Sequence, residues 1–400
     1  MNWEFIFTNT AAWLIAPETI AYAIATVGLA VHFGYGGLLN FGQAGFMAIG
    51  AYSYAISILS FDLPWWVGIL IGLVASVIFA FILGLPTLRL RADYLAIATV
   101  GLAVHFGYGG LLNFGQAGFM AIGAYSYAIS ILSFDLPWWV GILIGLVASV
   151  IFAFILGLPT LRLRADYLAI ATIAAAEVLR LLFNSTVFDE YTNSADGLGG
   201  YHAGFRAANP IPEGKYGFGP FIFNQDGWWV RLFGLGILVL ALLMVWLLMR
   251  SPWGRVVKGI REDEDAVRAL GKNVFSYKMQ VLVVGGCLGS LGGVVLSLPS
   301  AVVPGVYLPS LTFFLWTILL LGGAATVLGP VIGSVIFWLL MAFLSVFLPA
   351  LSQAGFLPFM TPIQAGVLRF VLVGVGLMLI VIFRPQGILG NKKELTFNAR

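Results

Sequence analysis

The side chains of this sequence that could do chemistry are concentrated in one stretch, residues 250–278. Only 9% of all residues are charged, yet this stretch holds seven Lys or Arg and four Asp or Glu. Because it lies between two long apolar runs, it is expected to be an aqueous loop. Its excess of cations predicts that the loop lies on the cytoplasmic side of a membrane. The chemistry that such a loop offers is the docking of a partner.

A short amphipathic helix is predicted within this loop. Gly254 and Gly271 bracket a stretch that can be helical. Ile260, Val267 and Leu270 are spaced by seven and three residues, so on one helix they would share a face, with the acidic residues on the others. This pattern favours a helix that docks at the membrane surface. The alternative is a solvated loop with the usual cationic bias.

The rest of the sequence lacks the motifs of catalysis and of nucleotide or metal binding. The P-loop pattern is absent, because Gly271-Lys272-Asn273 lacks both the first glycine and the hydroxyl residue. No set of Cys and His residues has the spacing of metal ligands, and no nucleophile elbow is present. Cys287 is the single cysteine, which excludes an intrachain disulfide. We therefore expect no enzyme activity, no cofactor and no metal, and a conduit whose energy comes from another protein.

The apolar segments around these residues predict the elements that position them. Hydrophobic residues make up 60% of the chain and the mean hydropathy is +1.00, as in a polytopic helical membrane protein. The apolar runs are roughly 17–25 residues long and do not alternate, which disfavours a β-barrel. The net charge of +3 says little about nucleic acid, since the cations lie at helix ends and in one loop. We expect an all-α transmembrane helical bundle of about nine spans plus a duplicated block of three segments.

A glycine-rich segment with two amide side chains, residues 34–50, lies in the first apolar region and occurs again at residues 107–123. Glycines let helices approach closely, and polar side chains at this depth need partners from neighbouring helices. Tight helix packing is therefore the favoured interpretation, and a broken helix that lines a pathway is the alternative. In the second occurrence the candidate positions are Asn113, Gly115, Gln116 and Gly123.

Two further patterns in apolar segments are candidates for function. Glu177 and Arg180 are three residues apart, so they would share a helix face and could pair. Ionisable residues in a span suggest function, although a position near the end of the span also suits a structural pair. Gly285, Gly289 and Gly293 recur every four residues, a spacing that lets another helix pack closely. A pore lining is the alternative for this ladder.

The sequence also repeats itself. Residues 23–99 recur without a single change as residues 96–172, an offset of 73 residues. Old internal repeats of transporters survive only as weak similarity, so this identity indicates a very recent tandem duplication or an error in assembling the sequence. His32 and His105 are consequently one histidine written twice. The predicted division is a segment at 1–22, a first copy at 23–95, a second copy at 96–172, the remaining transmembrane region at 173–390 with the charged loop at 250–278, and a tail at 391–400.

Several strings of this sequence resemble a known family of permeases. Glu264-Asp265-Ala266, followed by Gly271, approximates the EAA…G pattern in the coupling loop of ABC importer permeases. The strings LRLRADYLAIAT, NFGQAGFMAIGAY, LLLGGAATVLGPVIGS and FRPQGILG resemble the permease subunits of branched-chain amino acid importers, the LivM type. These matches reach from near residue 20 to near residue 390. TNSADGL at 192–198 departs from the more glycine-rich string that is usual in the family.

The resemblance implies a multi-pass permease of the bacterial inner (plasma) membrane that translocates branched-chain or related amino acids. It also implies ABC ATPase subunits, a second permease subunit, a periplasmic or lipid-anchored substrate-binding protein and membrane lipid as partners, with no nucleic acid. A permease for urea, amides or another small solute is an alternative. An ion-coupled secondary transporter is another; it would need buried carboxylates, for which Glu177 is the candidate. The residues expected to couple the chain to the ATPase are Arg255, Arg261, Glu264, Asp265, Ala266 and Gly271.

The resemblance leads to a prediction about the repeat. Three added segments change the parity of the bundle, and the loop and tail carry the cations that should keep them inside. We expect the second copy to occupy the family's position, with the first copy as an appended element. A chain without residues 23–95 should then transport at least as well as the full chain.

Overall fold

The computed structural model describes residues 92–163, 165–216 and 223–353, together with scattered positions between 53 and 72 and between 361 and 389. The chain divides into two units, Met1–Leu85 and Pro86–Arg400, and the fold below is that of the second unit. Most of the first copy of the repeat, most of the predicted last span and the whole of the tail lie outside the described residues. The predictions made for them therefore stay predictions.

The described part of the chain is mostly helical, which confirms the predicted fold class. The long elements are α5 (Ala92–Leu102), which continues into the π-helix η3 (Ala103–Tyr108), then α6 (Gln116–Phe134), α7 (Trp138–Thr160), α8 (Ala165–Phe183), α11 (Gln225–Arg250), α12 (Pro252–Glu262), α13 (Glu264–Ala269), α14 (Val274–Ser297), α15 (Pro309–Gly322) and α16 (Gly329–Gln353). The short ones are η4 (Thr186–Phe188), α9 (Asp189–Thr192), α10 (Ala203–Ala207), η5 (Pro304–Val306) and the antiparallel strands β1 (Lys215–Tyr216) and β2 (Phe223–Asn224), with Lys215 opposite Asn224.

Many of these helices are long and apolar enough to cross a membrane. Five qualify among the described residues, or six if the bent pair of Tyr167–Phe183 and Thr186–Thr192 is one span. Leu95–Tyr108 and Gly329–Trp338 are shorter apolar helices. Helices can cross lipid because all their backbone groups bond within the segment. The number of spans in the whole chain stays a prediction, since part of it lies outside the described residues.

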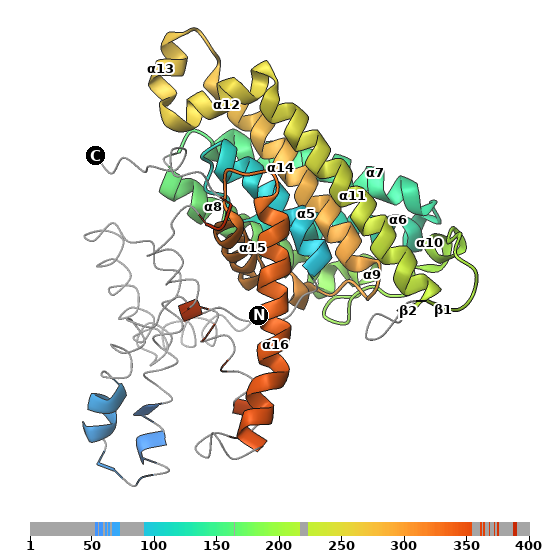
Figure 1. Ribbon diagram of the computed structural model, residues 1–400, viewed down its shortest axis with the longest axis vertical. Helices are drawn as coiled ribbons and strands as arrows, with labels where there is room; N and C mark the ends of the chain where they lie inside the picture. The colour runs from blue at the N-terminus through green and yellow to red at the C-terminus, as the bar shows by residue number, and fades with distance from the viewer. Residues whose placement is uncertain are drawn as a thin grey trace, which may run out of the picture. The chain divides into compact units, whose positions relative to one another are not determined.

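Helix α14 is the centre of the bundle. It packs against α5, α6 and α7, and Figure 1 shows it in light orange beside the cyan α5. Most of its residues are buried, including Val281, Leu282, Leu288 and Val295. By contrast, α7 and α11 each turn a row of large apolar side chains outward, as expected for helices that face lipid. The core therefore lies around α14, and this helix begins directly after the charged loop.

The two ends of the bundle differ in charge. Helices α12 and α13 lie at one end of α11, and the β-hairpin lies at its other end (Figure 1). Since α11 is 26 residues long, these ends are about 39 Å apart. The first end carries the cations of the loop, and the second carries the acidic stretch at residues 185–227. This asymmetry is the one on which the prediction of a cytoplasmic loop rests.

Candidate functional site

The core of the bundle contains a cluster of polar side chains. His105, Asn113 and Gln116 are each 0% exposed, although they come from the π-helix, the segment after it and the start of α6. Buried polar groups are costly unless they are hydrogen-bonded, so the partners of these three side chains decide whether the cluster is stable.

The orientation of Asn113 is fixed by a backbone donor. The N–H of Gly115 donates to Asn113 Oδ1 at 2.7 Å. The Asn113 Nδ2 atom therefore donates its two hydrogens elsewhere, to Nδ1 of His105 at 2.9 Å and to Oε1 of Gln116 at 3.1 Å. Because His105 Nδ1 accepts, the imidazole is the neutral tautomer with its proton on Nε2.

The remaining donors of the cluster bind carbonyl groups of the helices around it. His105 Nε2 donates to the carbonyl oxygen of Leu282 in α14 at 3.1 Å. Gln116 Nε2 donates to the carbonyl oxygens of Ala98 in α5 and Gly285 in α14, at 3.2 and 3.1 Å. Every nitrogen-bound hydrogen of the three side chains thus has an acceptor, and the cluster ties α5, η3, α6 and α14 together.

The helix is broken between η3 and α6. Residues 109–115 are not helical, and Gly110 has φ +66°, a conformation that favours glycine. Phe114 N–H donates to Thr172 Oγ1 at 3.0 Å, and Trp316 Nε1 donates to the carbonyl of Asn113 at 3.2 Å. Irregular backbone at membrane depth needs such protein partners. The structure thus combines the two interpretations of this segment: the helix is broken, and its polar side chains pack inside the bundle.

The glycines singled out in the sequence lie where neighbouring segments leave no room for a side chain. A Cβ atom at Gly285 would overlap the His105 ring, and one at Gly289 would lie 2.5 Å from Gln116 Nε2. At Gly293 it would overlap the carbonyl oxygen of Met120. The same holds across the interface at Gly123 against Ser290, and at Gly115 against Thr172. A pathway role for these residues stays a prediction.

Glu177 and Arg180 form an ion pair in α8. Arg180 Nε donates to Glu177 Oε2 at 2.9 Å, and Nη2 donates to Oε1 at 2.5 Å. The side chain of Glu177 is 34% exposed, so the carboxylate is not sealed in the core. No Asp or Glu is buried among the residues whose side chains the structure describes, which leave out Asp93 and Asp166. This part of the chain offers no buried carboxylate of the kind that an ion-coupled transporter needs.

The charged loop contains two helices where the sequence predicted one. Helix α12 ends at Glu262 and α13 begins at Glu264, with Asp263 between them. The Asp263 carboxylate accepts from the N–H groups of Asp265 and Ala266 at 3.0 and 2.9 Å, so it caps α13. This cap stabilises a new helix start, and the single helix of the sequence prediction is wrong for that reason.

The apolar side chains of the loop pack differently from the prediction as well. Ile260 and Val267 are buried with Val274 of α14 in a small cluster that holds α12 and α13 against the bundle. Leu270, expected on the same face, is 79% exposed, which contradicts that expectation. The break at Asp263 interrupts the helical period, and Leu270 lies just past the last turn of α13.

The charged residues of the loop divide into an inner and an outer set. Glu264 accepts from Arg268 at 2.6 Å and pairs with Lys278 of α14, so it holds the loop to the bundle. Asp265 pairs with Arg268 at 3.1 Å, but its side chain is 89% exposed. Arg255 and Ala266 are also exposed. We call Arg255 and Asp265, with the neighbouring Ala266, the outer set, because these residues are exposed to a partner protein.

Gly271 ends α13 in a left-handed conformation. Its φ is +75°, and an added Cβ would meet nothing within 4 Å. The glycine is therefore needed for its backbone conformation and not for space.

Arg261 belongs to the inner set and makes the longest-range contact of the loop. Its Nη1 donates to the carbonyl oxygen of Gly107 in the π-helix at 2.6 Å, and its side chain is 14% exposed. Sequence reasoning named Arg261 but missed this partner. The two residues are 154 positions apart, and no local pattern joins them.

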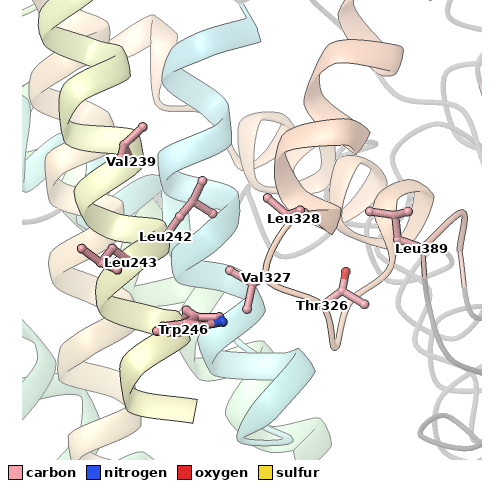
Figure 2. Close-up of a pocket in the computed structure, with 8 residues that line it drawn as sticks. All are labelled: Val239, Leu242, Leu243, Trp246, Thr326, Val327, Leu328 and Leu389. Carbon is pink, nitrogen blue, oxygen red and sulfur yellow. The ribbon is translucent and has the colours of Figure 1, made fainter. Parts of the chain in front are cut away.

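An apolar hollow of about 600 Å³ lies between α11 and the loop that joins α15 to α16. Figure 2 shows Trp246 and its neighbours on α11 facing Val327 and Leu328, with Leu389 beside them. Thr326 supplies the hydroxyl group among these residues. A zwitterionic solute needs charged or several polar partners, so this hollow suits an apolar occupant.

Membrane-length helices packed around a polar cluster, with a charged two-helix loop at one end, define a helical membrane protein. The family of branched-chain amino acid transport system permease components matches residues 14–107 and 94–382. The chain belongs to this family. The longer match begins at the second copy of the repeat and runs to the predicted last span.

Individual relatives agree with this family. A LivM permease protein of Salmonella typhimurium is 31% identical over 252 residues, which are 60% of this chain and 59% of the relative. A probable LivM protein of Methanocaldococcus jannaschii is 26% identical over 340 residues, 75% of this chain and 91% of the relative. The nucleoside permease NupC of Lactococcus lactis is 25% identical over 195 residues, 47% of this chain and 58% of the relative. The chain thus spans about three fifths of the length of the Salmonella protein.

Proposed function

We propose that this chain is the transmembrane permease subunit of an ABC importer that carries branched-chain or related amino acids across the bacterial inner membrane. The observation that carries the proposal is the α12–α13 loop in a chain of this family. It projects from the cation-rich end of the bundle, is held by Glu264 and Arg261, and leaves Asp265 exposed for a partner.

The proposed transport cycle uses partners for the steps that this chain cannot perform. A substrate-binding protein delivers the solute to the outer face, and a second permease subunit completes the pathway. ATPase subunits dock on α12 and α13, because the sequence itself has no P-loop. Closure of the ATPases moves the loop, and the bundle alternates between outward and inward access.

The proposed substrate rests on a comparison of sequence identity to relatives that carry different solutes. The LivM relatives are 26–31% identical, whereas the nucleoside permease is 25% identical over a shorter stretch. A branched-chain amino acid is therefore the first substrate to test. Nucleosides, urea and amides are the competing solutes. The partly exposed position of Glu177, the carboxylate that an ion-coupled transporter was expected to use, favours the importer over ion-coupled transport.

The second copy of the repeat is proposed to be the functional one. The longer family match starts at residue 94, and residues 96–172 supply α6, α7 and the polar cluster. A chain without residues 23–95 is expected to keep its transport activity. Loss of uptake in that chain, with normal insertion into the membrane, would show that the first copy has a role of its own.

The test of the coupling loop is a charge reversal at Asp265. The permease is reconstituted in proteoliposomes with its ATPase subunits and binding protein, and uptake of labelled leucine, guanosine and urea is measured. Asp265→Lys should remove most ATPase binding and reduce uptake at least about tenfold, a change equivalent to about 1.4 kcal/mol or more. The control is Glu190→Lys, the same kind of charge change at the opposite end of the bundle, which should leave ATPase binding intact.

The outcome that contradicts the proposal is equally clear. If Asp265→Lys binds the ATPase and transports at the wild-type rate, α13 is not the docking surface. Glu264→Lys is a poorer test, since reversing this charge also breaks the contacts with Lys278 and Arg268 inside the loop. A wild-type complex that takes up guanosine but not leucine would change the substrate and keep the permease.

A further inference from the structure

We propose that Arg261 is a positioning residue that transmits movement of the α12–α13 loop to the broken helix in the core. The inference rests on the proposed function, because it assumes that an ATPase moves the loop. It goes beyond that function by naming the contact through which the movement enters the bundle.

The contact between Arg261 and Gly107 joins a cation to the end of a helix. Gly107 lies near the C-terminus of the α5–η3 helix, where the last carbonyl groups lack partners within the helix. Arg261 Nη1 donates to the Gly107 carbonyl at 2.6 Å. A cation at a helix C-terminus is also favoured by the helix dipole. Since the side chain of Arg261 is only 14% exposed, water screens this interaction weakly.

The turn beside Arg261 has little room to move independently of α12. A Cβ atom at Gly107 would overlap the carbonyl oxygen of Ala324, in the loop between α15 and α16. A Cβ atom at Gly110 would lie 3.1 Å from Cγ of Arg261. Lys258, one helical turn before Arg261, lies 5.7 Å from the centre of the Tyr108 ring. A shift of α12 therefore displaces the turn at residues 107–110.

The same turn is joined to the polar cluster. Leu111 N–H donates to the carbonyl of His105 at 2.8 Å, and the His105 side chain binds Asn113 and the carbonyl of Leu282. Arg261 thus stands at one end of a hydrogen-bonded path that leads through the broken helix into α14. Helix α14 is also the direct continuation of the loop. The broken helix is held by α12 on one side, through Arg261, and by α14 on the other, through the carbonyls of Leu282 and Gly285, so relative motion of α12 and α14 must deform it.

The arginine of α13 lacks such a path. Arg268 pairs with Glu264 and Asp265 at the surface of the loop, and its side chain is 59% exposed. We therefore expect the exposed residues of α13 to bind the ATPase and Arg261 to transmit the movement of the loop to the broken helix.

The test compares Arg261→Gln with Lys272→Gln, which removes an exposed cation from the same loop. Each permease is reconstituted with its ATPase subunits and binding protein, and ATP hydrolysis and uptake are measured in the same proteoliposomes. Arg261→Gln should keep the ATPase bound and hydrolysing ATP, while uptake per ATP falls at least about tenfold, equivalent to about 1.4 kcal/mol. Lys272→Gln should change uptake per ATP by less than about twofold, since surface changes of this kind have small effects.

A second measurement does not depend on the substrate. Hydrogen exchange of the amides at residues 107–115 is compared with and without ATPase and nucleotide. It should change in the wild-type chain and in Lys272→Gln, and stay constant in Arg261→Gln. If the wild-type complex takes up none of the solutes, the proposed function fails, and this exchange experiment still decides the role of Arg261.

Three results would overturn the inference. The first is normal uptake per ATP and a normal exchange response in Arg261→Gln. The second is loss of ATPase binding in Arg261→Gln, because the arginine would then be part of the docking surface. Arg261→Lys keeps the charge and a donor, so it should assemble and show intermediate coupling. The third result is that neither Arg261→Gln nor Arg261→Lys assembles with the ATPase, because Arg261 would then be only a structural cap.

Discussion

Helices α5 and α8 begin with the same eight residues, Ala-Asp-Tyr-Leu-Ala-Ile-Ala-Thr, yet they occupy different places in the bundle. In α5 the isoleucine, Ile97, is 0% exposed, whereas in α8 its counterpart Ile170 is 38% exposed. Helix α5 packs against α14, α16, α11 and α15, while α8 packs mainly against α6. The local sequence thus forms a helix in both places, and the surroundings decide which face is buried.

The difference arises from the residues that come after the shared eight. Helix α5 continues into the π-helix and brings His105 to the core, while α8 continues to the partly exposed Glu177 and Arg180. Even the shared threonine has two uses. Thr99 donates to the carbonyl of Leu95 in its own helix, whereas Thr172 also accepts from Phe114. Equivalent substitutions in α5 and α8 therefore show how the surroundings of a residue change its contribution to stability when the local sequence is the same.

The largest contrast is expected for the isoleucines. Ile97→Ala should reduce the free energy of unfolding by about 2–5 kcal/mol, because it leaves a cavity among α5, α14 and their neighbours. Ile170→Ala should cost less than about 1 kcal/mol, since lipid or detergent can fill the space beside a partly exposed side chain. The measurement is unfolding of the purified protein in mixed micelles. Equal costs in the two variants would mean that the two helices are equally buried.

A smaller difference in stability between the two helices is expected when the next residue, an alanine, is replaced by leucine. Ala98 is 0% exposed, and its Cβ would lie 2.9 Å from a Cβ built on Gly292 of α14. Ala98→Leu should therefore cost about 1–3 kcal/mol through overpacking. Ala171→Leu, at the partly exposed equivalent position, should be nearly neutral. Thermal unfolding midpoints in detergent would show this, and a neutral Ala98→Leu would argue against the close approach of α5 and α14.

The smallest difference is expected for the threonines, and here the substitution in α8 should be more destabilising than the one in α5. Thr172→Val removes the side-chain acceptor of Phe114 N–H and should cost about 1–2 kcal/mol. Thr99→Val loses a bond to a carbonyl of its own helix and should cost less than about 0.5 kcal/mol. The same unfolding assay applies, with hydrogen exchange at Phe114 as a local readout. If Thr99→Val were the more damaging change, the assignment of the two threonines would be wrong.

Part of this architecture could be predicted from the sequence. Hydropathy predicted the helical class, and the density of charge predicted the loop at residues 250–278. The break at Asp263 was missed, although an aspartate just before Glu264-Asp265-Ala266 is a favoured N-cap. The wrong expectation for Leu270 came from that error.

The long-range contacts had no sequence signal. Asn113 and Gln116 were expected to need partners, but nothing in the sequence pointed to the carbonyls of Leu282 and Gly285, which lie 177 and 169 positions from the side chains that bind them. The contact of Arg261 with Gly107 is of the same kind. A carbonyl group is present at every position, so only the fold can show which one lies within reach.

The hydrogen bonds of the polar cluster give the repeat a genetic consequence. The residues that reach α14 are written twice, as His32 with Gln43 and as His105 with Gln116, but Leu282 and Gly285 occur once. Because the two copies are identical in sequence, loss of either one leaves the same chain, with one such set of side chains for α14. A point mutation at His105 or Gln116, by contrast, changes the set that makes the bonds to α14. We therefore expect deletion of one whole copy to be tolerated better than a single substitution within the second.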